Sequence, residues 1–370
     1  MHLITSRANI YLKKQGGYNM KKKSLLPLVL LTASSLALAV SSPVNNVTPF
    51  AETVAVQAQE ATTLKVAYLA PHGDKSFASV VVAMQGDVVV DAQIDEFQFV
   101  EGDQWTGVPN ADATFGEGFA DGVTLISKRA DSEGYSAMMA DMADSTVTYA
   151  DNLNAIEDFA KGKTVAEIEE GITALNDLGE DGNVSDVVSG ATLADSAGYL
   201  QAIIDAANEG TEFTGAEADA ANLELKQAVA APHGDQSFAI VTTAVDGDKV
   251  VAATLDEFQF VEGDQWSGVP NADAGFGEGI AEGVTLVSKL ENSEAYSQLM
   301  TDIAGSTVPY AENLQAITQF AAGKTTAELE EAVAELQDLG EEGNVADVVS
   351  GSTLADTSGY LQAIVDVANQ

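Results

Sequence analysis

The chain is an internal duplication, and this feature constrains its fold more than any other. Residues 64–208 and 225–369 align without a gap at a constant offset of 161, and 98 of the 145 aligned positions are identical. Each copy is as long as an ordinary domain and can bury a core of its own, while two copies are too few for a solenoid. The sequence therefore predicts two homologous domains, 63–208 and 223–370, joined by a flexible linker over 209–222.

Within each copy the apolar pattern changes from strand-like to helical. In the first copy strands are predicted at 64–69, 76–84, 88–94 and 123–127. From residue 132 onward apolar residues recur at spacings of three and four, which indicates helices, the last of them over 194–207. Thr164 and Glu167 match a capping box at the start of one helix. The expected fold class is α+β: two tandem homologous domains, each an antiparallel sheet with packed helices.

The amino-terminal residues match a secretory signal peptide. Lys21, Lys22 and Lys23 precede an apolar run that closes on Ala37-Leu38-Ala39. We expect a signal peptide over 1–39, with Met20 as the true start and cleavage near Ala39. The apolar run of about sixteen residues is shorter than the roughly 20 that cross a bilayer, so retention as an anchor is the alternative. Residues 40–62 are predicted to be a flexible spacer.

Charge and cysteine content exclude several classes of function. The chain has 57 Asp plus Glu against 16 Lys plus Arg, a net charge of −41, and it contains no cysteine. A polyanion of this size does not bind nucleic acid or an anionic membrane surface through charge. Without cysteine there is no disulfide, no thiolate metal site and no lipid anchor on an amino-terminal cysteine.

Each copy contains one histidine in an Ala-Pro-His-Gly-Asp segment, at His72 and His233. The segment is typical of a turn whose histidine packs locally. One imidazole per copy does not favour a metal site, so none is predicted. Acid-base chemistry near neutral pH is the functional alternative, although no partner is marked beside the histidine in the sequence.

Eleven residues, 95–105, recur without change at 256–266. One interpretation is a core strand with a buried tryptophan and solvated acids. The other is a platform of rings for a flat cofactor, with polar groups at its edge. The candidate pocket residues are His72, Asp95, Phe97, Gln98, Phe99 and Trp105, with His233, Asp256, Phe258, Gln259, Phe260 and Trp266 in the second copy.

The Gly-rich stretch 110–122 and its counterpart 271–283 have neither a Rossmann nor a P-loop pattern, and a surface loop is predicted for both. Near the end of each copy lies a different motif, a small turn directly before a helix. The residues alone are compatible with a helix N-cap or with a phosphate site. The motif residues are Asp186, Ser189, Gly190, Ala191 and Thr192, and Asp347, Ser350, Gly351, Ser352 and Thr353.

This Asp-x-x-Ser-Gly-Ala-Thr motif resembles the flavinylation signature of the FMN-binding domain family. In that family a flavin transferase joins FMN through a phosphoester to the last threonine. With the tandem copies, the signal segment and the Ala-Pro-His-Gly-Asp and Asp-Glu-Phe-Gln-Phe segments, the chain is similar to PplA-type flavoproteins of Gram-positive extracellular electron transfer. The resemblance implies covalent FMN on Thr192 and Thr353, with Asp186 and Asp347 serving the transferase reaction or the turn. Ser352 departs from the alanine of the motif.

The function expected from this resemblance is electron transfer outside the cytoplasmic membrane by a secreted or surface-associated protein. The two flavins would accept electrons from a membrane donor and pass them to extracellular acceptors such as iron or soluble shuttles, since the redox chemistry belongs to the cofactor. A cofactor-free surface domain is one alternative. A flavin-dependent reductase of a small carboxylate is another, but it needs cationic clamps, and Arg129 is replaced by Leu290 in the second copy.

Overall fold

The structure, a computed structural model, describes residues 60–143, 145–179, 182–340 and 343–370. The predicted signal peptide and residues 40–59 of the predicted spacer lie outside this part. The described residues form one compact unit that contains both repeats. No helix in the described part of the chain is long and apolar enough to cross a membrane.

The first repeat begins with an antiparallel meander and continues into helices. Its elements are β1 (Glu60–Leu69), β2 (Ser76–Gln85), β3 (Val88–Glu101), β4 (Val123–Ser127), α1 (Ser132–Ala143), α2 (Tyr149–Ala160), β5 (Lys163–Thr164), α3 (Val165–Asp177) and α4 (Ser196–Glu209). The predicted strands at 76–84 and 88–94 pair as an antiparallel hairpin, but the second strand runs on to Glu101 and so includes most of the unchanged segment. Thr62 is fully buried in β1, so the ordered fold starts before the predicted end of the spacer.

The second repeat has the same element order, except that an isolated bridge between Lys249 and Thr325 takes the place of β5. Its elements are β7 (Glu224–Ala230), β8 (Ser237–Asp246), β9 (Lys249–Val261), β10 (Thr285–Ser288), α5 (Ser293–Ala304), α6 (Tyr310–Ala321), α7 (Thr326–Asp338) and α8 (Thr357–Ala368). The capping box predicted at Thr164 with Glu167 is present, and Thr325 with Glu328 forms the same capping box in the second repeat. The predicted α+β class is confirmed, since each repeat is an antiparallel sheet with packed helices.

The flexible linker predicted over 209–222 is wrong. Thr211–Ala218 forms strand β6, which pairs antiparallel with β1 and extends the first sheet to the order β4-β3-β2-β1-β6. Phe213 on this strand is buried between the repeats. The backbone hydrogen bonds and the buried ring order a segment whose Gly, Thr and Glu content suggested flexibility.

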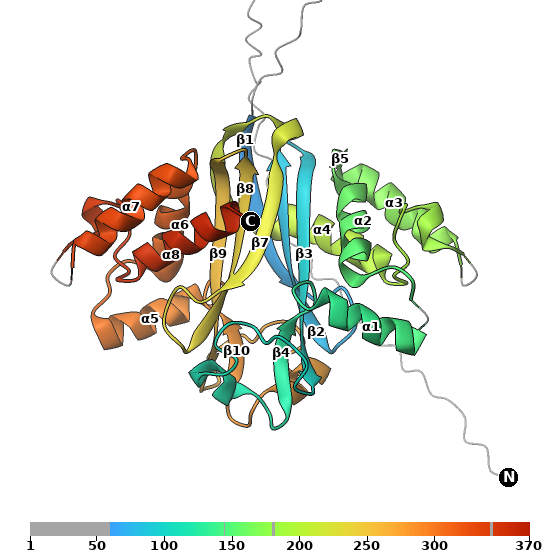
Figure 1. Ribbon diagram of the computed structural model, residues 1–370, viewed down its shortest axis with the longest axis horizontal. Helices are drawn as coiled ribbons and strands as arrows, with labels where there is room; N and C mark the ends of the chain where they lie inside the picture. The colour runs from blue at the N-terminus through green and yellow to red at the C-terminus, as the bar shows by residue number, and fades with distance from the viewer. Residues whose placement is uncertain (1–59, 144, 180–181, 341–342) are drawn as a thin grey trace, which may run out of the picture. The chain divides into compact units, whose positions relative to one another are not determined.

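The two sheets pack against each other, and the helices cover their outer faces (Figure 1). Strand β2 is buried along nearly its whole length because its side chains alternate between two cores. Ala78, Val80 and Val82 face the helices of the first repeat, whereas Phe77 and Val81 belong to a core that continues into the second repeat. The repeats therefore share a hydrophobic interface in addition to the core within the first repeat.

The Gly-rich stretches are part of this interface, so the predicted surface loops are wrong. Each contains a short 3-10 turn, Thr114–Gly118 in the first repeat and Gly275–Gly279 in the second. Phe115 and Phe276 on these turns are 1% exposed and pack on phenylalanines of the opposite repeat. The glycines let the backbone approach closely: a Cβ at Gly118 would lie 2.1 Å from the Phe260 ring.

Candidate functional site

The motif turn lies on the surface immediately before α4. Val188 and Ala191 are buried and anchor the turn, while Ser189, Gly190 and Thr192 are exposed. Gly190 has φ +93, and a Cβ there would lie 3.3 Å from the Cβ of Ala155 on α2. The turn therefore requires glycine both for its backbone angle and for its close approach to α2.

A buried asparagine fixes the backbone around Thr192. The side-chain oxygen of Asn152, on α2, accepts hydrogen bonds from the Thr192 amide at 2.6 Å, the Thr192 hydroxyl at 3.2 Å and the Leu193 amide at 3.2 Å. The Asn152 amide group donates to the carbonyl oxygen of Thr148 in return, and Asn152 is fully buried. The threonine is thus held in one place at an exposed position.

The second repeat reproduces this geometry. Asn313 accepts from the Thr353 amide at 2.6 Å and from its hydroxyl at 3.2 Å, and Thr353 is exposed. The departure at Ser352 is accommodated, because its buried hydroxyl lies 2.7 Å from the hydroxyl of Thr357. The two threonines therefore have equivalent hydrogen-bonded surroundings despite the changed neighbour.

The interpretation of the motif threonine as a helix N-cap is wrong. Helix α4 begins at Ser196 and its N-cap is Asp195, three residues after Thr192; α8 begins at Thr357 after Asp356. The Thr192 amide is also satisfied by Asn152. The turn is therefore a separate element, and its last residue, Thr192, precedes the N-cap of the helix.

The histidine segment lies beside the start of the same helix. His72 Nδ1 is 2.7 Å from an Asp195 carboxylate oxygen, and both side chains are about half exposed. A Cβ at Gly198 would lie 2.7 Å from the Pro71 carbonyl oxygen, so this glycine permits the contact. His233 and Asp356 repeat the pair at 2.6 Å. The fold thus brings the histidine segment to the start of the helix that follows the motif in both repeats.

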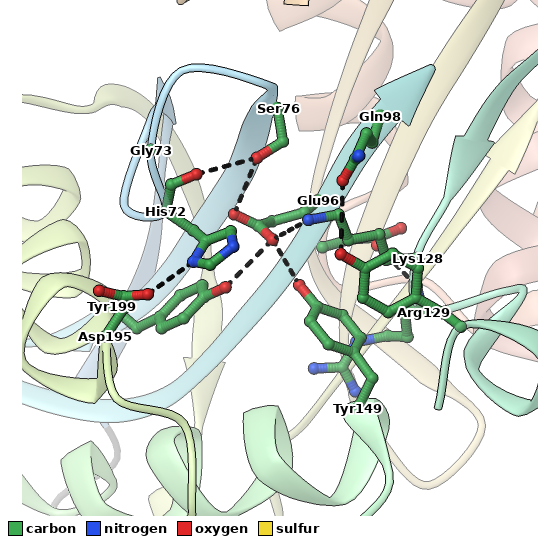
Figure 2. A network of polar contacts seen from close by, with 12 residues as sticks. His72, Gly73, Ser76, Glu96, Gln98, Lys128, Arg129, Tyr149, Asp195 and Tyr199 are labelled. Carbon is green, nitrogen blue, oxygen red and sulfur yellow. Dashed lines mark hydrogen bonds and ion pairs between the residues drawn. The ribbon is translucent and has the colours of Figure 1, made fainter. Parts of the chain in front are cut away.

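A buried polar network lies beneath this pair (Figure 2). The Glu96 carboxylate accepts from Lys128 Nζ at 2.8 Å, the Tyr149 hydroxyl at 2.8 Å and the Tyr199 hydroxyl at 3.0 Å. Glu96 and Lys128 are fully buried. Ser76 connects the network to the histidine loop, because its hydroxyl can donate to the His72 carbonyl oxygen at 3.3 Å or to Glu96 at 3.4 Å.

The environment of this network shifts several pKa values. Burial, followed by the negative charge of Glu96, raises the pKa of Tyr149 and Tyr199 well above the usual value, so both phenols stay protonated donors. Burial is the largest single influence and lowers the pKa of Lys128, but the charges and hydrogen bonds of Glu96 and Tyr135 together outweigh it, so the net shift is upward. Lys289 pairs with Glu257 at 2.7 Å in the second repeat and is shifted in the same way.

The predicted ring platform is divided between two faces of a strand. Side chains alternate along β3, so Phe97 and Asp95 face the second repeat while Gln98 and Glu96 face the helices of the first. Phe97 is fully buried and stacks on Phe77 at 5.1 Å between ring centroids. Its counterpart Phe258 stacks on Phe238 at 5.0 Å. Other protein rings therefore occupy the faces that a cofactor would need at these two positions.

The two aspartates of the unchanged segments are structural. Asp95 accepts from the Ser127 hydroxyl at 2.5 Å and the Arg129 amide at 3.1 Å, and burial raises its pKa to about 6. Asp256 accepts from the Ser288 hydroxyl and the Leu290 amide, and burial raises its pKa to about 7. These contacts fix the turn after β4 and after β10.

Gln98, Phe99 and Trp105 border a groove of about 750 Å³ between the end of β3 and α1, but the Phe99 ring packs on Phe119 and on Phe276 of the second repeat. Met138 and the exposed Met142 form its other wall. Tyr135 connects this groove to the buried network, because its hydroxyl donates to Gln98 at 3.4 Å and its ring packs on Tyr149.

The corresponding residues of the second repeat are Gln259, Phe260 and Trp266. The Phe260 ring packs on Phe115 of the first repeat, and the Trp266 indole donates to the Glu262 carbonyl oxygen at 2.9 Å. Ser350 and Gly351 line a separate hollow of about 440 Å³ together with Phe320 on α6. Asp186 and Asp347 are exposed on the turns that lead to the threonines.

The sequence interpretation missed the residues that support this site. Asn152, Lys128 and Asp195 were not singled out, and Glu96 was noted only as part of the unchanged segment 95–105, although all four recur unchanged in the second copy. A usable signal existed for Asn152, because it falls on the apolar face of a predicted helix next to Leu153. An amide at such a position is expected to have a specific partner.

Within the described residues, no group of three or more His, Asp or Glu side chains is arranged to hold a metal ion. A scan against protein-family models found no match for the chain, and searches of curated proteins and of solved structures found no significant match. Function is therefore inferred from the residues and contacts described above.

Proposed function

We propose that the protein is an exported electron carrier of the FMN-binding domain type, with FMN joined by a phosphoester to Thr192 and to Thr353. The observation that carries the proposal is the pair of exposed threonines at the end of the same motif, each held by a buried asparagine with the same two distances. A modifying enzyme needs an accessible hydroxyl in a fixed position, and both repeats provide one.

The surroundings of the threonines fit such a group. The turn keeps Gly190 and Gly351 in backbone conformations that favour glycine, so no side chain crowds the approach at these positions. In the first repeat, a separate groove of about 750 Å³ is lined by Gln98 and Trp105, which would supply an amide and an aromatic wall to a flat ring. When bound, the flavin supplies the electron-transfer chemistry, and the chain positions it and controls its surroundings.

Maturation and electron flow on this proposal involve other proteins. A flavin transferase attaches FMN to both threonines, a membrane donor reduces the carrier, and iron or soluble shuttles outside the cell oxidise it. The net charge of −41 makes encounters with cationic or metal-bearing partners more favourable at low ionic strength.

A reductase of small carboxylates has less support. Such an enzyme needs free cationic groups that clamp the substrate. The Arg129 guanidinium is engaged by the Ile94 carbonyl oxygen, Asn154 and Glu157, and Leu290 replaces it in the second repeat. We therefore favour a carrier over a substrate-specific enzyme.

Mass spectrometry of the exported protein, coexpressed with a flavin transferase, tests the proposal. We expect two FMN-sized adducts in the wild type, one in Thr192→Ala or Thr353→Ala, and none in the double variant. Thr211→Ala removes an exposed threonine outside the motif and serves as the matched control, which should keep both adducts. A colourless, unmodified wild-type protein would favour a cofactor-free binding domain instead.

A further inference from the structure

Asn110 and Asn271 are the two non-glycine residues with positive φ in the described part of the chain, at 63° and 65°. They occupy equivalent positions at the start of the two Gly-rich stretches. Asparagine tolerates this conformation better than most residues, but glycine adopts it at no steric cost. The presence of asparagine at both positions therefore suggests that its side chain makes a specific contact.

The side-chain amides of both asparagines donate hydrogen bonds to the opposite repeat. Asn271 Nδ2 donates to the carbonyl oxygens of Gly73 at 2.8 Å and Ser76 at 2.7 Å, in the first repeat. Asn110 Nδ2 donates to Gly234 at 2.8 Å and Ser237 at 2.6 Å, in the second. Each amide thus bridges the two ends of the histidine loop of the opposite repeat.

A backbone hydrogen bond strengthens each bridge. The Phe276 amide donates to the Asp74 carbonyl oxygen at 2.7 Å, and the Phe115 amide donates to Asp235 at 3.0 Å. The loop of residues 73–76 therefore has three carbonyl groups bound by the second repeat. On its other side, His72 and Pro71 contact Asp195 and Gly198 of its own repeat.

We infer that Asn271 is a positioning residue for the His72–Asp195 pair, and that Asn110 has the same role for His233 and Asp356. Each histidine loop is bridged by an asparagine of the other repeat, and its histidine pairs with the aspartate that lies three residues after a motif threonine. The two candidate sites are consequently built across the interface, and a change in one repeat reaches the site of the other. This inference does not depend on flavin attachment.

The tautomer of the His72 ring shows whether the contact between His72 and Asp195 is formed. A carboxylate can only accept a hydrogen bond, so the contact with Asp195 requires a proton on His72 Nδ1. Nitrogen-15 and proton NMR of the ring, at about pH 9 where imidazole is neutral, identifies the Nδ1–H form. The unflavinylated mature protein is the sample, so failure of the proposed function leaves this test intact.

The test variants are Asn271→Gly and Asn110→Gly, because glycine keeps the positive φ and removes only the donors. In Asn271→Gly we expect loss of the Nδ1–H signal of His72 with His233 unchanged, and in Asn110→Gly the reverse. His72→Gln assigns the two rings. If Asn271→Gly folds poorly, Asn271→Asp, which also adopts positive φ without an amide donor, takes its place.

Two results overturn the inference. One is an unchanged Nδ1–H signal in both asparagine variants. The other is equal loss at both histidines in either variant, because this would reflect general loosening rather than a contact between one asparagine and one loop.

Discussion

Arg129 and Glu157 form an ion pair at 2.6 Å whose members are both replaced in the second repeat, by Leu290 and Thr318. Glu157 is 8% exposed in its side chain, and it also accepts from the Ile94 amide at 2.6 Å. The same position of the fold is therefore filled by an ion pair in the first repeat and by uncharged side chains in the second. We expect the first repeat to tolerate the uncharged pair of the second.

Arg129→Leu alone leaves a buried carboxylate without its cation. We expect it to lower the free energy of unfolding by about 3 kcal/mol at pH 8, the cost typical of a broken buried pair. The double variant Arg129→Leu with Glu157→Thr should recover most of this loss, because it copies the second repeat. Urea denaturation of the four proteins of the cycle measures the effect. A double variant no more stable than Arg129→Leu would contradict this interpretation.

The stability of the whole protein should decrease from mildly acid to neutral pH. Burial raises the pKa of Asp95 to about 6, and of Glu157 and Asp256 to about 7. The folded state therefore binds more protons than the unfolded state between about pH 4 and pH 7, and the free energy of unfolding falls as the pH rises through this window. Protonation of carboxylates at lower pH also reduces the repulsion among the excess negative charges, which again makes the folded state more stable at mildly acid pH.

Denaturation curves from pH 4.5 to 8 at constant ionic strength check this dependence. In Glu157→Gln the decrease in the free energy of unfolding from pH 4.5 to 8 should be smaller by about 1–3 kcal/mol, because the amide does not titrate. Glu170→Gln, at an exposed helical position, is the matched control and should leave the slope nearly unchanged. A wild-type stability maximum between pH 7 and 8 would show that buried carboxylates do not dominate.

Lys128→Met should lower the stability of the folded protein, although methionine is an apolar side chain of similar length in a buried site. It removes the cation that faces Glu96 in a fully buried site, and we expect a loss of about 3–5 kcal/mol in the free energy of unfolding. Lys161→Met is the control, since Lys161 is 43% exposed and 3.3 Å from Asp91, and should change stability by less than about 1 kcal/mol. Equal effects of the two variants would argue against a structural role for the buried pair.

Asn152→Ala should reduce FMN attachment at Thr192 without affecting Thr353. It removes the acceptor that holds the Thr192 backbone and hydroxyl, and losing hydrogen bonds worth about 1 kcal/mol each corresponds to roughly a tenfold effect. Peptide mass spectrometry after coexpression with a flavin transferase measures both sites in the same molecule. Asn152→Asp keeps the acceptor and should lie between wild type and alanine. Equal reduction at both threonines would contradict the local role of Asn152.

Local patterns in the sequence were sufficient for the elements and for the class of fold. Apolar periodicity located strands and helices because side-chain alternation and helical spacing depend only on neighbouring residues. The capping boxes at Thr164 and Thr325 follow from contacts three residues apart. The duplication predicted that both repeats share one architecture, and the structure has this.

Strand alternation, applied more strictly, would also have separated Phe97 from Gln98, since adjacent strand residues point to opposite faces. The sequence placed them in one pocket because both recur unchanged. Recurrence identified constrained positions but did not distinguish a cofactor contact from the packing of one repeat on the other.

The sequence by itself determined the duplicated α+β fold and the two motif threonines as candidates for attachment. Only the tertiary structure decided that Asn152 holds Thr192, that His72 pairs with Asp195, and that Asn271 bridges the histidine loop of the other repeat. These contacts join residues 40, 123 and 198 positions apart. Such pairs form because the packed sheets bring distant segments together, and no local periodicity encodes them.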